Sequence, residues 1–290
     1  MMTLRLAAMA LGLMLAAFSG AGVTSVRAQE LKCEPERIAE KYPDLAGKTL
    51  RIGGDPQTRP FIFRDPTNFN NIIGFDADLA RAVFDCAGAK YEFFLGGWSG
   101  LVPAVMAGQI DVMWDALYYL PERAKKLDFI VYMQAGIGAL AQPGNPKNVK
   151  SIGDLCGLSA VTLLGTVEEA TLRKQDEACR TAGKPGIEIQ VGPDNAAAMR
   201  QLLNRRVDIF FIDLGLAYGL MQERSSEVTF AFAHLTDLVQ AAAVPKGRKD
   251  LVNAIYDGLR VAQTNGTQRK LYEKYGMEPS LQRPAEILRE

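Results

Sequence analysis

The chain has 290 residues, with 33 lysines and arginines against 33 aspartates and glutamates, four cysteines and one histidine. This length suits one large domain or two medium ones, and the balanced charge argues against a nucleic-acid partner, which needs a basic surface. A single histidine argues against a His-rich metal centre. With 48% hydrophobic and 23% charged residues, the composition is that of an ordinary folded protein.

The first 28 residues have the pattern of a secretory signal peptide. Arg5 gives a positive start, residues 6–18 form an apolar run too short to span a bilayer, and Val26-Arg27-Ala28 is a small-residue cleavage site. The alternative is an uncleaved N-terminal anchor. We expect residues 1–28 to be removed during export, which leaves a mature chain that begins near Gln29.

From Lys48 onward, short apolar strands alternate with helical patterns, which is typical of an α/β protein. Phe75, Leu79 and Val83, for example, recur at helical spacing. In the first half we expect strands over residues 50–53, 91–95 and 110–114, and helices over residues 75–86, from a Ser99 cap to Gly108, and over residues 121–126.

The same construction follows a second time, which indicates two α/β units. Apolar strands at residues 137–141 and 239–244 connect them, so we expect two hinged lobes, residues 29–135 plus 241–290 and residues 136–240, with a cleft between. Within the second unit and after it, we expect strands over residues 160–163, 187–191 and 207–212, and helices over 167–173, 195–204 with Asp194 as cap, 251–263 and on to Tyr275.

The four cysteines form an even set that an oxidising compartment would pair. None has C-x-x-C spacing, so neither a thioredoxin-type redox site nor a zinc ribbon is indicated. Three connectivities are possible, and unpaired buried thiols are the alternative. We favour Cys33 with Cys86 and Cys156 with Cys179, because each bridge then stays within one structural unit.

Aspartates follow three of the expected strands. Ligands of open α/β sheets bind beyond the carboxyl ends of strands, and this rule selects Asp55, Asp115 and Asp213. A carboxylate in such a place can hold an ammonium group by charge-assisted hydrogen bonds. The alternative is a capping or turn role, for which Asp55 before Pro56 is the clearest case.

Arg123 is the candidate for binding a carboxylate. It lies at an expected helix start soon after the third strand, where anions are favoured, and arginine presents a planar fork of donors that matches a carboxylate. Considered alone, it is more often a solvated surface charge.

Five segments in one order resemble the periplasmic solute-binding proteins of ABC importers, in the branch that binds polar amino acids, and the match runs from about Lys48 to Met277. The segments are Gly74-Phe75-Asp76-Ala77-Asp78-Leu79-Ala80, Trp98-Ser99-Gly100-Leu101-Val102-Pro103-Ala104, Gly108-Gln109-Ile110-Asp111-Val112, residues 121–129, and Asn265-Gly266-Thr267 followed by Lys270-Leu271-Tyr272-Glu273-Lys274-Tyr275-Gly276.

The resemblance implies two Rossmann-like lobes, joined by two hinge strands, that close over one small polar solute. Arg123 matches the family arginine that grips the α-carboxylate, Asp213 the acid that takes the α-ammonium, and Thr166 a threonine that helps to hold the carboxylate. Asp55 and Phe61 match a loop that lines the pocket. The implied protein is a periplasmic monomer without cofactor or metal that delivers its solute to an ABC permease in the inner membrane.

This chain also departs from the family pattern. Asp115, Ala116 and Tyr118 stand where small serine-like residues are usual, and Thr58 stands where the first loop usually has an aromatic residue. Asp115 could favour a cationic ligand, or pair with Arg59 or Arg123 and leave the pocket neutral. Trp98 could stack on the ligand or serve only in packing.

Three functions are consistent with these residues. The first is a solute-binding protein without enzymatic activity, the second an exported lyase or dehydratase in which Asp115, Tyr118 and Asp213 do acid–base work, and the third a sensory or dehydrogenase-accessory protein. The sequence favours the first, because it has no Ser-His-Asp set around His234, no phosphate-binding G-x-x-x-x-G-K-[ST] loop and no metal-ligand cluster.

Overall fold

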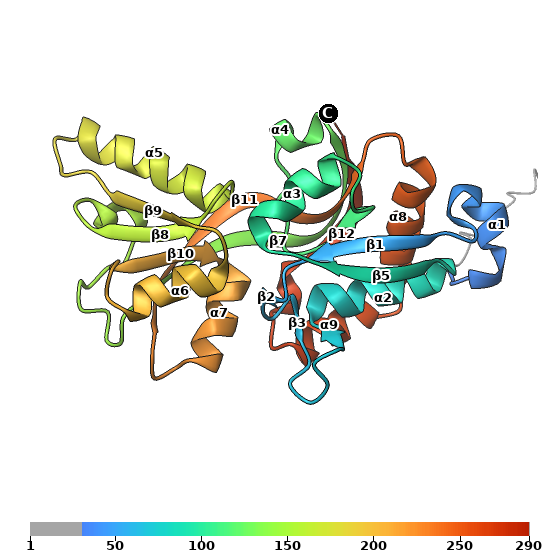
Figure 1. The fold of residues 1–290 in the computed structure, drawn as a ribbon, viewed down its shortest axis with the longest axis horizontal. Coiled ribbons are helices and arrows are strands. Elements are labelled where there is room, and N and C mark those ends of the chain that lie inside the picture. The colour runs from blue at the N-terminus through green and yellow to red at the C-terminus, as the bar shows by residue number, and fades with distance from the viewer. Residues whose placement is uncertain (1–30, 290) are drawn as a thin grey trace, which may run out of the picture. The chain divides into compact units, whose positions relative to one another are not determined.

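The computed structural model describes residues 31–289, so the predicted signal peptide lies outside the described residues. The chain from Leu31 onward forms one compact unit. Its main element is a nine-stranded mixed sheet with the strand order β5-β1-β6-β11-β7-β10-β8-β9, and β12 pairs with β7. The predicted fold class is confirmed: helices cover two halves of this sheet, and two long strands join them (Figure 1).

The first half is built around three parallel strands. Leu50 and Ile52 of β1 are fully buried, and β1 pairs in parallel with β5 and β6. Helices α2 and α8 pack against each other beside these strands (Figure 1). The elements of this half are α1 (Ile38–Lys41), β1 (Thr49–Gly54), α2 (Phe75–Ala87), β5 (Lys90–Leu95), α3 (Trp98–Met106), β6 (Val112–Met113), α4 (Pro121–Ala124), α8 (Lys249–Thr264), α9 (Thr267–Lys274) and β12 (Gln282–Leu288).

A small three-stranded sheet, β2-β3-β4, follows β1. It comprises β2 (Gln57–Thr58), β3 (Ile62–Arg64) and β4 (Ile72–Ile73).

The second half repeats the parallel arrangement with β8, β9 and β10. Figure 1 shows α5 and α6 alongside these strands. The elements are β8 (Ser159–Leu163), α5 (Val167–Thr181), β9 (Glu188–Gly192), α6 (Asn195–Leu203), β10 (Ile209–Asp213) and α7 (Leu214–Glu223).

Two long antiparallel strands, β7 (Leu127–Ala141) and β11 (Thr229–Pro245), run through both halves. Their register shifts between Leu235 and Val239, opposite the stretch from Gln134 to Gly136. The sequence predicted only residues 137–141 and 239–244 as strands, because polar and glycine residues interrupt the apolar runs. The lobe boundaries at residues 135/136 and 240/241 stay predictions, although the first falls within this irregular stretch.

Most of the other predicted elements are present, with a few corrections. Asp194 caps α6 as predicted, with its Oδ1 accepting a hydrogen bond from Ala197 N at 2.7 Å. The Ser99 cap was wrong, because α3 begins at Trp98 with Gly97 as its N-cap and without a side-chain cap. The short helix α1, the small sheet, α7 and β12 were not predicted from the sequence.

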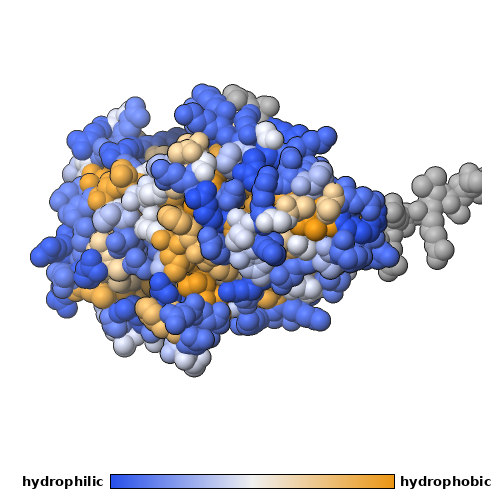
Figure 2. All heavy atoms as spheres, turned by 45° about the vertical axis from the view of Figure 1, so that its right-hand side comes forward, coloured by the Kyte–Doolittle hydropathy of each residue, from blue (hydrophilic) through white to orange (hydrophobic). Residues whose placement is uncertain are grey.

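Two disulfides are formed, Cys33–Cys86 and Cys156–Cys179, which is the favoured pairing. The first disulfide lies in the first half and joins Cys33 to helix α2, and the second lies in the second half and joins Cys156 to helix α5. Among the helices of residues 31–289, none combines the length and the apolar character that a membrane crossing requires. Figure 2 shows a mainly hydrophilic surface on which hydrophobic residues gather in the middle of the view, between two hydrophilic regions.

Candidate functional site

A small cavity lies between the two halves of the sheet, and both contribute to its lining. Its volume is about 40 Å³, which is room for a few water molecules. A solute of amino-acid size therefore requires the walls to separate. The lining residues are Thr58, Trp98, Ala116, Tyr118, Arg123, Thr162, Leu163, Thr166, Val167, Glu168, Asn195, Ile212, Asp213 and Leu216.

The first wall comes from loops at the carboxyl ends of β1 and β6 and from the starts of α3 and α4. Trp98 begins α3, and its backbone N–H donates to Asp55 Oδ2 at 3.0 Å. Ala116 adopts a left-handed conformation with a φ of 48°, which non-glycine residues adopt at a cost. Its N–H donates to the buried Asp76 Oδ2 at 2.7 Å, so the surrounding structure holds this loop in place.

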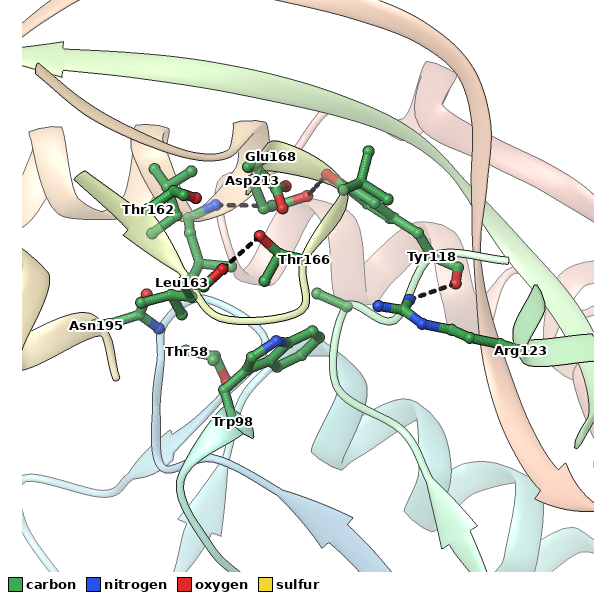
Figure 3. A pocket seen from close by; sticks show the side chains of 14 residues that line it. Thr58, Trp98, Tyr118, Arg123, Thr162, Leu163, Thr166, Glu168, Asn195 and Asp213 are labelled. Atoms are coloured by element: carbon green, nitrogen blue, oxygen red, sulfur yellow. Dashed lines mark hydrogen bonds between the residues drawn. The ribbon is translucent and has the colours of Figure 1, made fainter. Parts of the chain in front are cut away.

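Arg123 is buried at the cavity, although it is an arginine on a four-residue helix. Its Nη1 donates to Tyr118 O at 2.9 Å (Figure 3). Its Nη2 donates to Gly165 O of the opposite wall, also at 2.9 Å. Burial lowers the pKa of the guanidinium, while the nearby Glu168 charge raises it. Within residues 31–289, no carboxylate lies within ion-pair distance of this guanidinium, so backbone carbonyls are its partners here.

The second wall is formed by the N-terminal ends of three helices. Thr166 caps α5 by accepting from Glu169 N at 3.2 Å, and Glu168 lies in the first turn of that helix. Asn195 is the first residue of α6. Asp213 caps α7, with its Oδ1 accepting from Leu216 N at 3.1 Å. Helix N-termini carry partial positive charge, which stabilises the acids placed here.

Two buried carboxyls, Glu168 and Asp213, lie beside the hydroxyl of Tyr118 (Figure 3). Burial raises the pKa of Asp213 to about 6. Burial, followed by the charge of Asp213, raises the pKa of Glu168 to about 7. The two acids therefore titrate near neutral pH, Asp213 slightly below it.

The hydrogen bonds of Tyr118 support a protonated acid at this place. Its hydroxyl oxygen lies 2.7 Å from Gly136 O and 2.6 Å from Asp213 Oδ2. A phenol has one proton to donate, so it can serve only one of two acceptors. Both contacts are satisfied when Asp213 carries a proton and donates it to Tyr118. Gln240 Nε2 donates to the same Oδ2 at 2.7 Å.

Five of the eight predicted site residues line the cavity together: Trp98, Tyr118, Arg123, Thr166 and Asp213. The other three do not line this cavity, and their contact with a solute stays a prediction. Phe61 is fully buried and packs edge-on against Phe75, with ring centroids 6.5 Å apart. Asp55 and Asp115 are also fully buried.

Asp55 and Asp115 stabilise the β1–β2 loop by hydrogen bonds to its backbone and to Thr58. Asp115 Oδ2 accepts from Asp55 N at 2.7 Å, and its Oδ1 accepts from Thr58 Oγ1 at 2.5 Å. Asp55 in turn accepts from Gln57 N at 3.0 Å. Burial raises the pKa of both carboxyls, that of Asp115 well above its usual range.

Among residues 31–289, Asp115 is paired with neither of the two arginines suggested for it, and its role as a contact for a cationic ligand stays a prediction. Arg123 binds carbonyls, and Arg59 lies 3.7 Å from Glu223 across the gap between the walls. The two residues that depart from the family pattern, Asp115 and Thr58, contact each other, since the Thr58 hydroxyl donates to Asp115 Oδ1.

Three lining residues, Glu168, Asn195 and Thr162, were not predicted from the sequence. Glu168 stands beside Glu169 at a helix start, where acids are common because the helix dipole stabilises negative charge. Asn195 follows Asp194, an ordinary N-cap residue. Only burial distinguishes them, and the sequence pattern does not report burial at a helix end. Among residues 31–289 no cluster of His, Cys, Asp or Glu has the arrangement of a metal site. The lining instead offers one fixed cation, two titratable acids and neutral polar groups.

Several known proteins are similar to this chain in sequence and in fold. The L-cystine-binding protein TcyJ of Escherichia coli strain K12 is 26% identical over 228 residues, which are 78% of this chain and 82% of that protein. An ancestral arginine-binding protein, solved with arginine bound, superposes with a TM-score of 0.71 at 29% identity and covers 78% of this chain and 97% of its own.

A third similar protein is the ancestral amino acid-binding protein AncCDT-1, described as a precursor of cyclohexadienyl dehydratase. Its TM-score is 0.69 at 29% identity, over 83% of this chain and 98% of that one. The sequence profile of the bacterial extracellular solute-binding proteins, family 3, matches residues 50–278. With most of its length matched, this chain belongs to that family.

Proposed function

We propose that the protein is a periplasmic binding protein that captures an α-amino acid, or a close derivative, between its two lobes and delivers it to an ABC transporter. The observation that carries the proposal is the charge arrangement of the cavity. A buried guanidinium bound to carbonyls lines the same small space as two buried acids with raised pKa values. A zwitterion supplies the missing partner of each.

The carboxylate of the solute binds Arg123 in this proposal. The guanidinium has five N–H donors, and its two hydrogen bonds to the described part of the chain go to neutral carbonyl oxygens. A bidentate carboxylate forms shorter and stronger charge-assisted bonds than those carbonyls do. Exchange of the Gly165 carbonyl for the ligand frees part of the opposite wall. There the Thr166 hydroxyl, which donates to Leu163 O at 2.9 Å, becomes a second donor when it turns its proton from that carbonyl to the ligand.

The ammonium of the solute binds Asp213, with Glu168 beside it. In the empty cavity a proton shared with Tyr118 satisfies Asp213. An ammonium group donates three hydrogen bonds and carries a full positive charge, so it replaces that proton and restores both acids to the ionised form. Capture is then coupled to proton release.

Contacts between the lobes accompany closure. Ala196 N donates to Gln57 Oε1 at 3.2 Å, and Arg59 pairs with Glu223 at 3.7 Å. A solute that contacts both walls favours the closed arrangement by its difference in affinity for the two states. We expect the inner-membrane permease to recognise the closed monomer. The name of one relative from Haemophilus influenzae, a probable amino-acid ABC transporter-binding protein, supports a transporter as the partner.

We propose that the protein is not an enzyme. The resemblance to a dehydratase precursor and a Glu168 pKa of about 7 make acid–base chemistry the alternative to test. In the proposed site, Arg123 and the two acids bind the two charged ends of a zwitterion. Glu168 and Asp213 are then occupied by the ammonium group and do not act as catalytic bases.

The test is the identity of whatever the exported protein retains. Purified protein is denatured, the released small molecules are analysed by mass spectrometry, and the candidate is titrated back by calorimetry. The proposal predicts an α-amino acid that binds once per chain and returns with unchanged mass. The Arg123→Ala variant is the control and should retain none. A solute without a carboxylate contradicts the proposal, and conversion to a lighter product would establish the enzyme instead.

A further inference from the structure

The side-chain amide of Asn195 has no partner in the protein. Asn195 is 3% exposed, and neither its Oδ1 nor its Nδ2 has a hydrogen-bond partner. The helix does not need this side chain, because Asp194 caps Ala197 N at 2.7 Å and Gln57 accepts from Ala196 N at 3.2 Å. The amide therefore serves no visible purpose in α6.

Such an arrangement is costly for the empty protein. A buried amide without hydrogen bonds loses its hydration and receives nothing in return, and native proteins rarely tolerate such groups. An apolar residue of similar size would fill the same space without that cost. Because the amide lines the cavity, a group that enters the cavity is the natural partner.

The place of Asn195 indicates which part of a solute it meets. Figure 3 shows Asn195 on the opposite side of the cavity from Arg123, with Trp98 and Thr58 between them and Asp213 above. A solute whose carboxylate lies at Arg123 and whose ammonium lies at Asp213 therefore has its side chain directed toward Asn195. Thr162 and Leu163 complete this end of the cavity.

The chemistry of an amide selects among side chains. Asn195 presents two N–H donors and one carbonyl acceptor. A carboxylate would satisfy only its donors, and an ammonium or guanidinium would satisfy only its acceptor. A neutral group that both donates and accepts, above all a primary carboxamide, satisfies both at once.

We propose that Asn195 determines specificity by pairing with the carboxamide end of the solute's side chain, so that the protein selects amino acids of the glutamine or asparagine class. This inference rests on the proposed function, because it takes the α-carboxylate and α-ammonium as fixed at Arg123 and Asp213. It concerns a separate group at the far end of the cavity.

The test compares glutamine, asparagine, glutamate, methionine and arginine by calorimetry on the wild-type protein and on Asn195→Leu. The wild type should bind the carboxamide amino acid of better fit roughly 10- to 100-fold more tightly than methionine, which is of similar size and lacks the amide. In Asn195→Leu this preference should fall to within about threefold. The melting temperature of the empty variant should not fall, because two unpaired polar atoms are removed.

Asn195→Asp is the second variant, and it keeps the shape of the side chain at a helix start that tolerates an acid. It should lose carboxamide preference and gain affinity for arginine. Asn253→Leu, on α8 in the other half of the sheet, is the control and should leave all five affinities unchanged.

Two results would overturn the inference while the proposed function stands: an unchanged preference in both Asn195 variants, or a wild type that binds arginine or glutamate more tightly than either carboxamide amino acid. If the wild type binds no α-amino acid at all, the proposed function fails with it. A fall in the melting temperature of Asn195→Leu without a change in selectivity would make Asn195 a structural residue.

Discussion

The protein contains two layers of buried carboxyl groups that differ in their partners. The deep layer, Asp55, Asp76 and Asp115, accepts hydrogen bonds from backbone N–H groups and from hydroxyls of fixed neighbours. The cavity layer, Glu168 and Asp213, lies against one phenol that cannot donate to every acceptor around it. All five have raised pKa values.

The pKa shift therefore does not separate a structural acid from a binding acid here. Access to the cavity does. Away from the cavity, as for Asp115, the acid stabilises a loop. At the cavity, as for Asp213, an entering ligand can add donors to those that Leu216 N and Gln240 Nε2 already supply. Substitutions in the cavity layer should therefore affect binding most, and substitutions in the deep layer should affect stability most.

The largest effect is expected from Asp213→Asn on binding. Loss of the charge that faces the ammonium should cost about 2–5 kcal/mol of binding free energy, measured by calorimetry with the retained amino acid. The empty protein should keep its melting temperature, because asparagine is as good an N-cap as aspartate. Gln240 Oε1, which has no partner now, can accept from the new amide after a flip of its own amide. Wild-type affinity in this variant would remove Asp213 from the site.

Asp115→Ala should affect stability first. The N–H of Asp55 would remain buried without its acceptor, which costs about 1–3 kcal/mol in the free energy of unfolding. Chemical denaturation measures this loss, and Asp115→Asn is the control, since it keeps one acceptor oxygen and should lose less. A fully stable Asp115→Ala protein that cannot bind its solute would show direct contact with the ligand instead.

The pH dependence should have opposite signs for stability and for binding. Carboxyls titrate near pH 4 when unfolded, whereas the pKa values of Asp213 and Glu168 are about 6 and about 7 in the folded protein. Their contribution to the stability of the empty protein is fully present below pH 4 and is lost as the pH rises through 7. Ammonium binding favours the ionised acids, so affinity should rise over the same range, by at most about tenfold per pH unit for each acid.

Calorimetry and thermal melts between pH 5 and pH 8 measure both trends. Arg123 and Tyr118 face the same acids but keep their protonation over this range. Glu168→Gln should remove the change near pH 7 from both the melting temperature and the affinity plotted against pH. Parallel rather than opposite trends would contradict the assignment of these two acids to the ammonium.

The smallest effect is expected from the exposed contact between the walls. The Arg59–Glu223 pair is 3.7 Å long, with side chains 38% and 49% exposed, and such pairs contribute about 0–1 kcal/mol. Arg59→Ala should therefore weaken solute affinity less than about fivefold, and high salt should abolish the difference. Arg37→Ala, which breaks an exposed pair with Glu40, is the control. A loss as large as that of Asp213→Asn would mean that this pair, rather than the solute, holds the lobes together.

Much of the fold could be predicted from the sequence. Strands such as β1 and helices such as α2 show a clear hydrophobic periodicity and are bounded by turn residues such as glycine and proline. The two long strands were underestimated, since Gln134 and Gly136 look like breaks in isolation and are tolerated at a bend between two paired segments. The α7 helix was missed because its apolar start, Leu214 to Leu216, continues the apolar run of β10.

The site was predictable where side-chain chemistry and position coincide. Arg123 and Asp213 could be found because each follows a strand and carries the charge that a zwitterion needs. Asp55 and Asp115 met the same rule, yet the Asp115 carboxylate binds the loop that holds Asp55, and the Asp55 carboxylate binds the backbone of Gln57 and Trp98. Glu168 and Asn195 were missed because burial, not residue type, distinguishes them from ordinary helix-start residues.

The most direct test of the central claim is calorimetry with three matched compounds: the retained amino acid, its decarboxylated amine and its deaminated acid. If Arg123 and Asp213 hold the two ends of a zwitterion, each analogue should bind at least about 30-fold more weakly to the wild type. In Arg123→Ala the amine should bind as well as the amino acid does. Equal binding of all three compounds by the wild type, or wild-type affinity for the amino acid in Arg123→Ala, would contradict the account.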